Sequence, residues 1–476
     1  MKITLRLKFI ALSQEFYWMN LKDYFMEIPD NKINTYLFFD DRQKKNLFGS
    51  GSADVAKPWL YSIYISNDSW ESTLKHEIAH CFTAEFGSGI FKLASGFNPS
   101  LIEGVAEAAD GFYDENSIHY LASLAYRNNF RVDIKSLFES FSFFSSVSSL
   151  SYIYSGSFIK YLVDNIGIEK VKLFYLDSNF DKDFKFDLSN IISNYESFID
   201  TLNTYDKKHK ANYYFGRKPL ISKVCPRYIS SSLSEAWEKY SFNEINQAET
   251  IFENVLSKAA SYSAIIGLSN IYKDQDSLYK AIQIIESHLD SFIGTSYEYD
   301  LKLRLADLLV MNQEIDKANE FYKYIKVAEP NRRLELISNV RLSLLKTGLI
   351  TKYVNGSEYD KYEILKALNK KSYVYSSIPL MIDLSQSLKE NYDLFLSNFV
   401  ENFEVMDEMS SYAVYELSQY MLQNQDYNTA RKMAGFSLRF KGNPELLLLY
   451  NENFKKTDWF IRNKERVLQQ IKINVN

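Results

Sequence analysis

Two histidines lie four residues apart, with a glutamate between them, in the segment TLKHEIAHCFTAEFG (residues 73–87) of a chain that has only five histidines among 476 residues. An α-helix advances about 100° per residue, so we expect His76 and His80 to project from one helix face and to bind one divalent cation. Glu77 is rotated by about 100° from His76, which places its carboxylate beside the cation, within reach of a water molecule bound there. The spacing therefore predicts a zinc site with a general base next to it.

A catalytic zinc site needs a third protein ligand and keeps a fourth position open. The segment NPSLIEGVAEAADGFY (residues 98–113) follows a glycine-rich loop, and Asn98 with Pro99 predicts the start of a second helix. On that helix we expect Glu103 to supply the third ligand. Glu107, one turn further on the same face, is expected to accept a hydrogen bond from the far nitrogen of a ligating histidine. The alternatives are a surface helix with two solvated histidines and a metal-free remnant of such a site.

HEIAH followed by LIEGVAE resembles the gluzincin clan of zinc metallopeptidases, and in particular the bacterial peptidase MA-like domains related to the aminopeptidase N catalytic domain. Those domains also carry a tyrosine followed by a small residue, Gly-Ser-Phe and an apolar helix, and YIYSGSFIKYLVDNIGIEKV (residues 152–171) is similar to that segment. The resemblance covers residues 35–180 and implies a zinc cofactor. It implies the following roles: zinc ligands for His76, His80 and Glu103, general base for Glu77, and oxyanion-stabilising phenol for Tyr152.

Two points stay open within this resemblance. Tyr154 is a second candidate for the phenol, and either tyrosine could instead belong to the core of an aromatic-rich helix. Relatives of aminopeptidase N use a Gly-x-Met-Glu-Asn segment, whose glutamate grips the free amine of the substrate. The corresponding segment here, LFGSGSADVAKPW (residues 47–59), contains no glutamate. We therefore expect an endopeptidase, or an enzyme that acts on another amide substrate, rather than an aminopeptidase.

The composition of the chain changes near residue 200. Before it, INTYLFFDD (residues 33–41) and YSIYISND (residues 61–68) alternate like strands, and helical patterns follow from Glu71 onward. Residues 201–230 are basic and aperiodic, and the chain beyond them has apolar residues at helical spacing. We therefore predict three parts: an α+β zincin-like metallopeptidase domain over residues 1–200, a linker over 201–230 and an all-α helical-repeat domain over 231–476.

Small residues recur in the C-terminal half at spacings that resemble tetratricopeptide repeats. Four alanines stand four residues before a further apolar or aromatic residue, namely Ala248, Ala281, Ala318 and Ala430. Three small residues stand 12 positions before one of these alanines, namely Ser269, Ala306 and Ser418. The resemblance implies closely crossing helical hairpins in a solenoid. The alternative is a set of unrelated hairpins, since small residues are common at helix crossings.

The net charge of −5 gives no electrostatic reason to expect a nucleic-acid partner. The longest uncharged stretch, residues 140–159, contains nine serines, which makes insertion into hydrocarbon costly, so we expect no transmembrane segment. The Lys-, Asn-, Ile- and Tyr-rich composition fits an AT-rich bacterial genome. We expect a bacterial protein that is exported or membrane-associated if the native chain extends upstream of Met1, and cytoplasmic otherwise.

Together these patterns predict a zinc-dependent peptide-bond hydrolase that acts on a peptide or protein substrate. The strand YSIYIS (residues 61–66) could pair with an extended substrate along its edge. The helical repeats are expected to bind the substrate or a protein partner. The alternative is a catalytically inactive, peptidase-like scaffold that acts through protein binding by its repeats.

Overall fold

The structure is a computed structural model, and the parts of the chain that it describes are residues 2–144, 147–179, 182, 188–202, 204, 207–217, 226–370, 372–388 and 394–470. In these parts the protein is mostly helical, with 73% helix, 4% strand and 24 α-helices. The predicted fold class, an α+β zincin-like metallopeptidase domain followed by an all-α helical-repeat solenoid, is therefore wrong. The two segments that alternate like strands do form strands, but they are short, and helices account for most of the N-terminal half.

The chain divides into two compact units, and the first unit combines residues from both halves of the sequence: Met1–Tyr205 with Ser418–Asn476. The second unit is Asp206–Leu417. This division differs from the predicted one, which places all residues after 230 in a single domain. The reason is that helices near the end of the chain pack against helices near its beginning.

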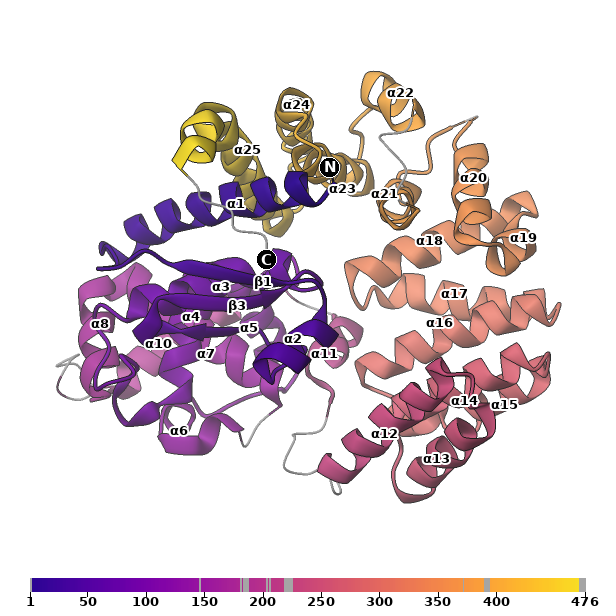
Figure 1. Ribbon diagram of the computed structural model, residues 1–476, viewed down its shortest axis with the longest axis horizontal. Helices are drawn as coiled ribbons and strands as arrows, with labels where there is room; N and C mark the ends of the chain where they lie inside the picture. The colour runs from indigo at the N-terminus through magenta and orange to yellow at the C-terminus, as the bar shows by residue number, and fades with distance from the viewer. Residues whose placement is uncertain are drawn as a thin grey trace. The chain divides into compact units, whose positions relative to one another are not determined.

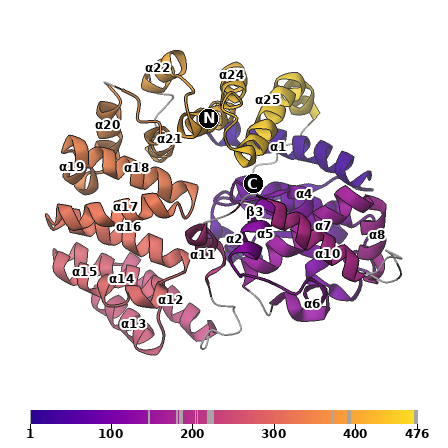
Figure 2. The ribbon, with the colours of Figure 1, turned by 180° about the vertical axis from the view of Figure 1, so that it is seen from behind.

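The first unit contains two small sheets and most of the helices drawn in indigo, magenta and yellow in Figures 1 and 2. Its strands are β1 (Asn34–Phe38), β2 (Val55–Lys57), β3 (Ser62–Ser66), β4 (Phe112–Tyr113) and β5 (Asn116–Ser117). Its α-helices are α1 (Lys2–Phe25), α2 (Asp41–Phe48), α3 (Trp70–Thr83), α4 (Pro99–Asp110), α5 (Ile118–Arg127), α6 (Ile134–Leu137), α7 (Ser148–Ile166), α8 (Ile168–Asp177), α10 (Leu188–Thr201), α24 (Tyr427–Ser437) and α25 (Pro444–Gln470). Short 3-10 turns η1 (Pro58–Leu60), η2 (Ser95–Phe97) and η3 (Ser140–Phe144) join them.

The three-stranded sheet has the order β1-β3-β2, with β1 parallel and β2 antiparallel to the central strand β3. Side chains alternate between its faces. Ile63 and Ile65 are fully buried, whereas Tyr64 stacks between Tyr36 and Phe48, with ring centroids 4.9 and 4.3 Å away. Strands β2 and β3 contact α3, and β1 and β3 contact α2. The sheet therefore supports the helix that carries the two histidines.

A series of packed helices runs from α25 through α1, α3 and α4 to α7, each in contact with the next or joined to it by side chains. Figures 1 and 2 both show α1 (indigo) beside α25 (yellow). The buried rings of Phe460, Phe9 and Trp70 connect α25, α1 and α3, with centroid distances of 5.8 Å between the first two rings and 5.4 Å between the last two. The first and last helices of the described chain thus belong to the core that holds α3.

The second unit consists of consecutive helices that pack on their neighbours in sequence. They are α11 (Lys208–Phe215), α12 (Pro226–Ser241), α13 (Ile245–Lys258), α14 (Tyr262–Asp274), α15 (Leu278–Glu286), α16 (Ser296–Met311), α17 (Ile315–Ala328), α18 (Arg332–Thr347), α19 (Ile350–Asn355), α20 (Glu358–Leu368), α21 (Ser377–Ser387) and α22 (Leu394–Asn402). The turn η5 (Leu289–Phe292) precedes α16, and α23 (Glu408–Gln423) leads back into the first unit. Helix α11 lies within the predicted linker but packs on α16.

The small residues picked out in the C-terminal half are all fully buried, as close helix crossings require. At one crossing, a Cβ added to Gly267 would come within 2.4 Å of the Phe252 ring. Helices α13 and α14 can pack this closely because residue 267 has no side chain. Ser418 and Ala430, however, belong to the first unit, and the boundary between the two units falls within α23. Helical spacing thus identifies hairpins without saying which unit they join.

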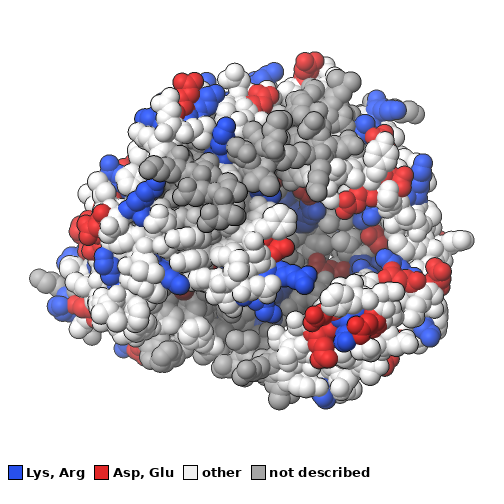
Figure 3. Space-filling model, in the orientation of Figure 1, with Lys and Arg blue, Asp and Glu red and all other residues white. Residues whose placement is uncertain are grey.

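No helix within the described ranges is both long and apolar enough to cross a lipid bilayer. On the face drawn in Figure 3, lysine and arginine side chains occur in small groups interspersed with aspartate and glutamate.

Candidate metal centre

Helix α3 carries its apolar core residues on one face and its two histidines on another. Leu74, Ile78 and Phe82 are fully buried and follow the spacing of four that places side chains on one helix face. His76 and His80 share a different face. The apolar face fixes the helix against its neighbours, so the imidazoles have a defined direction.

Helix α4 begins where the sequence predicts. The side chain of Asn98 accepts a hydrogen bond from the Leu101 amide at 3.2 Å and caps the helix, and Pro99 occupies its first turn. The same asparagine donates to the Phe138 carbonyl at 2.7 Å, beside α6. The start of α4 is therefore held on two sides, one turn before Glu103.

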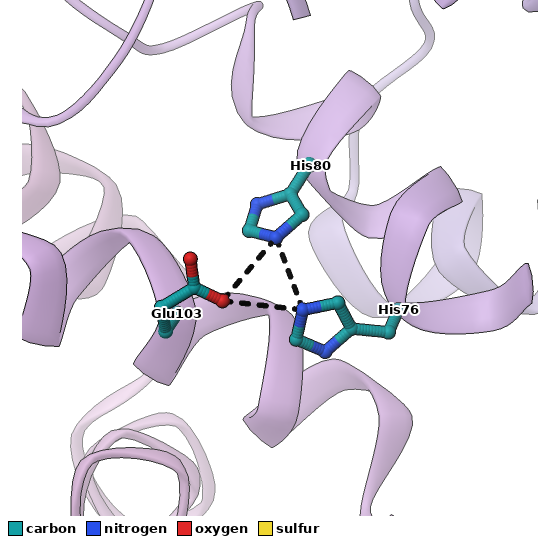
Figure 4. Close-up of side chains that lie close together, drawn as sticks. All are labelled: His76, His80 and Glu103. Carbon is teal, nitrogen blue, oxygen red and sulfur yellow. Dashed lines mark hydrogen bonds and ion pairs between the residues drawn. The ribbon is translucent and has the colours of Figure 1, made fainter. Parts of the chain in front are cut away.

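Three side chains from these two helices converge, as Figure 4 shows. The Nε2 atoms of His76 and His80 lie 3.1 Å apart. Glu103 Oε2 lies 3.3 Å from His76 Nε2 and 3.6 Å from His80 Nε2. Within the described ranges, no other group of three or more histidine, cysteine or carboxylate side chains is arranged to hold a metal ion.

The donor set and its spacing fit zinc. Nitrogen or oxygen ligands bound 2.0–2.1 Å from a tetrahedral zinc ion lie about 3.3 Å from each other. The observed separations of 3.1, 3.3 and 3.6 Å are close to that value. Two imidazoles and one carboxylate are also a ligand set that catalytic zinc sites use, with a fourth position left open.

Glu107 lies behind the first histidine. Its Oε1 atom is 3.4 Å from His76 Nδ1, and the residue is buried. A carboxylate there favours the tautomer that carries its proton on Nδ1, which leaves Nε2 free to bind a metal. The structure therefore brings Glu107 to the histidine nitrogen that the sequence analysis assigns to it.

The electrostatics of the cluster favour a positive charge between the imidazoles. Burial disfavours the charged form of His76, but its hydrogen bond to Glu103 and the carboxylates of Glu107 and Glu77 outweigh burial and raise its pKa to about 10. Burial raises the pKa of Glu107 to about 7. The imidazoles of His76 and His80 hold the pKa of Glu103 well below its usual range in spite of burial. The same carboxylates would stabilise a divalent cation bound between the two imidazoles and Glu103.

Glu77 is buried on α3 beside both histidines. Burial raises the pKa of its carboxyl group, and the charges of His80 and His76 oppose that rise. A carboxylate with a raised pKa accepts a proton more readily at neutral pH than an exposed one does. The arrangement is suited to a general base.

The structure separates the two tyrosines that the sequence leaves as alternatives. Tyr154 is 1% exposed, and its hydroxyl donates to the Phe130 carbonyl at 3.0 Å, so it belongs to the core. The hydroxyl of Tyr152 has a raised pKa because of burial and, next, because of the carboxylates of Glu103, Glu107 and Glu77. Of the two tyrosines, Tyr152 is therefore the one whose pKa the carboxylates of the candidate site help to raise.

Helix α7, which carries Tyr152, crosses α4 at very short range. A Cβ added to Gly156 would lie 2.5 Å from the Glu107 Cβ, and one added to Gly104 would lie 3.0 Å from the Ser155 Cβ. Neither position has room for a larger side chain without a shift of the helix. Gly156, the glycine of the Gly-Ser-Phe segment, therefore allows α7 to pack directly on the helix that carries Glu103.

One expectation about the sheet is wrong. The strand expected to offer an edge, YSIYIS, is the central strand β3, and its two sides already pair with β1 and β2. The edge strand that contacts α3 is β2.

Sequence reasoning also missed Lys75, which links α3 to two other helices. Its ammonium donates to the Asp110 carbonyl at 2.8 Å and to Glu452 Oε1 at 3.2 Å. A lysine beside a histidine carries no recognisable signal, and Glu452 is 377 residues away in sequence. Only the folded chain shows the link.

Comparison of the chain with protein-family models, with curated proteins and with solved structures gave no match.

Proposed function

We propose that the protein is a zinc-dependent peptide-bond hydrolase with a gluzincin-type ligand set. The observation that carries this proposal is the convergence of His76, His80 and Glu103 from two helices, with donor atoms 3.1–3.6 Å apart. The position of Glu107 behind His76 adds support, because such outer partners orient metal-ligating histidines. Glu77 and Glu107 are buried, and burial together with neighbouring carboxylates raises the pKa of each, which is typical of groups in a functional site.

The residues of the site have separate roles in this proposal. The two histidines and Glu103 would hold the zinc ion, which as a Lewis acid polarises the scissile carbonyl and acidifies water. Glu77 takes the proton from the attacking water and later delivers it to the leaving amine. The hydroxyl of Tyr152 donates a hydrogen bond to the oxyanion that develops on the substrate.

The one acidic residue in the segment LFGSGSADVAKPW before α3 is Asp54, and the contacts of its carboxylate favour endopeptidase action. Asp54 has a side chain that is 1% exposed and forms an ion pair with Lys44. Its carboxylate also accepts hydrogen bonds from Ser69 Oγ at 2.5 Å and Thr73 Oγ1 at 2.6 Å. Because these donors occupy it, Asp54 is not free to grip the amine at the end of a substrate.

The proposal is tested by metal content and by digestion of a peptide library. We expect about one zinc ion per chain in purified protein by elemental analysis. We also expect cleavage that a chelator abolishes and zinc restores, including cleavage of peptides with blocked N-termini. Zinc-free protein that cleaves nothing after zinc addition would instead support the inactive scaffold.

Exchange of Tyr152 for phenylalanine should lower kcat by about 10²–10³-fold, the usual loss when one oxyanion donor is removed. The matched variant Tyr154→Phe also removes one phenol from α7, but its hydroxyl bonds a core carbonyl. It should lower the free energy of unfolding by about 1 kcal/mol and leave kcat within a few-fold of the unaltered enzyme. Steady-state kinetics on a cleaved library peptide measure both, and equal kcat losses in the two variants would contradict the assignment.

A further inference from the structure

Helices α23 and α25 make direct polar contacts with α3 and with β5, a strand close after α4 in the sequence. Glu452 of α25 accepts a hydrogen bond from Lys75 of α3. Glu445 of α25 accepts one from Ser117 Oγ of β5 at 2.5 Å. Gln423, at the end of α23, donates to Glu71 Oε1 of α3 at 3.0 Å. The contacts thus reach the chain on both sides of the ligand set.

Lys75 is the point where three helices meet. It immediately precedes His76, and its ammonium donates to the main-chain carbonyl of Asp110, the last residue of α4, at 2.8 Å. The last carbonyls of a helix have no partner within the helix and carry the negative end of its dipole, so a lysine stabilises this end. The Asp110 carboxylate, 3.9 Å away, and Glu452 balance the charge of the lysine.

The contact is well placed to set the distance between α3 and α4. Lys75 is mostly buried, with a side chain 13% exposed, so water competes little with its partners. Lys75 is one residue from His76, and its acceptor Asp110 is about two helical turns from Glu103 on α4. Glu452 binds the Lys75 ammonium from a third helix, α25. The position of α25 is fixed because it packs on α1, and α1 packs on α3.

We propose that Lys75 and Glu452 are positioning residues of the metal centre: together they fix the spacing between the two histidines on α3 and the Glu103 carboxylate on α4. The inference rests on metal binding in the proposed function and not on the hydrolytic step. Helix α25 then supports the metal centre, although its described side chains include no metal ligand.

The test measures zinc affinity in full-length variants by competition with a chromophoric chelator. We expect Lys75→Met and Glu452→Ala each to weaken zinc binding by about 10-fold, the lower end of the effect of supporting partners of metal ligands. The double variant should bind zinc no more weakly than Lys75→Met alone, because the contact that Glu452→Ala removes is already lost in Lys75→Met. With Co²⁺ as probe, visible absorption should report an altered ligand geometry in the same variants.

The matched control is Asp458→Asn, also on α25. It breaks ion pairs with Arg431, at 2.9 Å, and with Arg462, both of which lie within the C-terminal helices. Its zinc affinity should equal that of the unaltered protein. An equal loss in this control, or unchanged affinity in Lys75→Met while the unaltered chain binds zinc, would overturn the positioning role alone. Absence of zinc binding by the unaltered chain would overturn the proposed function and this inference with it.

Discussion

Exchange of Glu77 for glutamine is expected to leave the zinc content unchanged while it lowers kcat by about 10²–10⁴-fold, the range that a positioned general base contributes. Glutamine has nearly the same shape, so α3 and its buried face should be undisturbed. It cannot accept a proton from water at neutral pH. Since Glu77 does not belong to the group His76, His80 and Glu103 that would hold the metal, the metal should remain in place.

Elemental analysis and library digestion of the same preparation measure both properties together. Glu85→Gln offers a matched control. The Glu85 carboxylate accepts hydrogen bonds from the Tyr61 hydroxyl at 2.8 Å and from the Asp30 amide at 2.9 Å, and it is not one of the three converging ligands. This variant should keep both zinc and turnover. Full activity in Glu77→Gln would refute the assignment of the base.

Replacement of Glu103 by alanine should remove the metal itself. Two imidazoles would be left without the carboxylate that lies 3.3 and 3.6 Å from them, and two ligands do not make a catalytic zinc site. We expect the affinity for zinc to fall by more than the 10–100-fold typical of supporting partners, with activity at background. Unfolding provides a second readout, since a ligand present at 100 times its Kd stabilises a protein by about 2.7 kcal/mol. Added zinc should raise Tm in the unaltered protein and have no effect on the variant.

Glu107→Gln provides the graded comparison for that result. It keeps all three ligand atoms and removes only the charge behind His76 Nδ1, so zinc affinity should fall by about 10–100-fold rather than vanish. Undiminished zinc binding in Glu103→Ala would show that the ion is held by other groups and would contradict the proposed ligand set.

The candidate site was accessible from sequence because its determinants are local. The spacing of His76 and His80 fixes their common face on any helix, and the cap at Asn98 fixes the phase of Glu103 and Glu107 on the next one. The two helices follow one another in the sequence, joined by residues 84–98, so the sequence places all four side chains on neighbouring elements. The choice between the tyrosines depended instead on the Phe130 carbonyl, a contact that no local pattern encodes.

The fold class was out of reach for the opposite reason. Alternation correctly marks β1 and β3, but it does not reveal that the sheet ends after three short strands. The spacing of small residues marks hairpins in the C-terminal half, including the pair Ser418 and Ala430, whose hydroxyl and carbonyl groups are hydrogen-bonded at 2.8 Å. It carries no information on the partner of a hairpin. The return of α25 to α1 is decided by contacts such as Phe9 with Phe460, which lie at opposite ends of the chain.

The return of α25 to the N-terminal helices has a consequence for biosynthesis. The ribosome finishes α4, and with it every ligand of the metal centre, 334 residues before it reaches Pro444, the first residue of α25. At about 5–20 residues per second, translation of that stretch takes some tens of seconds. During this interval α1 has no C-terminal partner and Lys75 lacks Glu452. A nascent chain that has not yet reached α25 would therefore hold its ligand set without the support of Glu452 and Phe460.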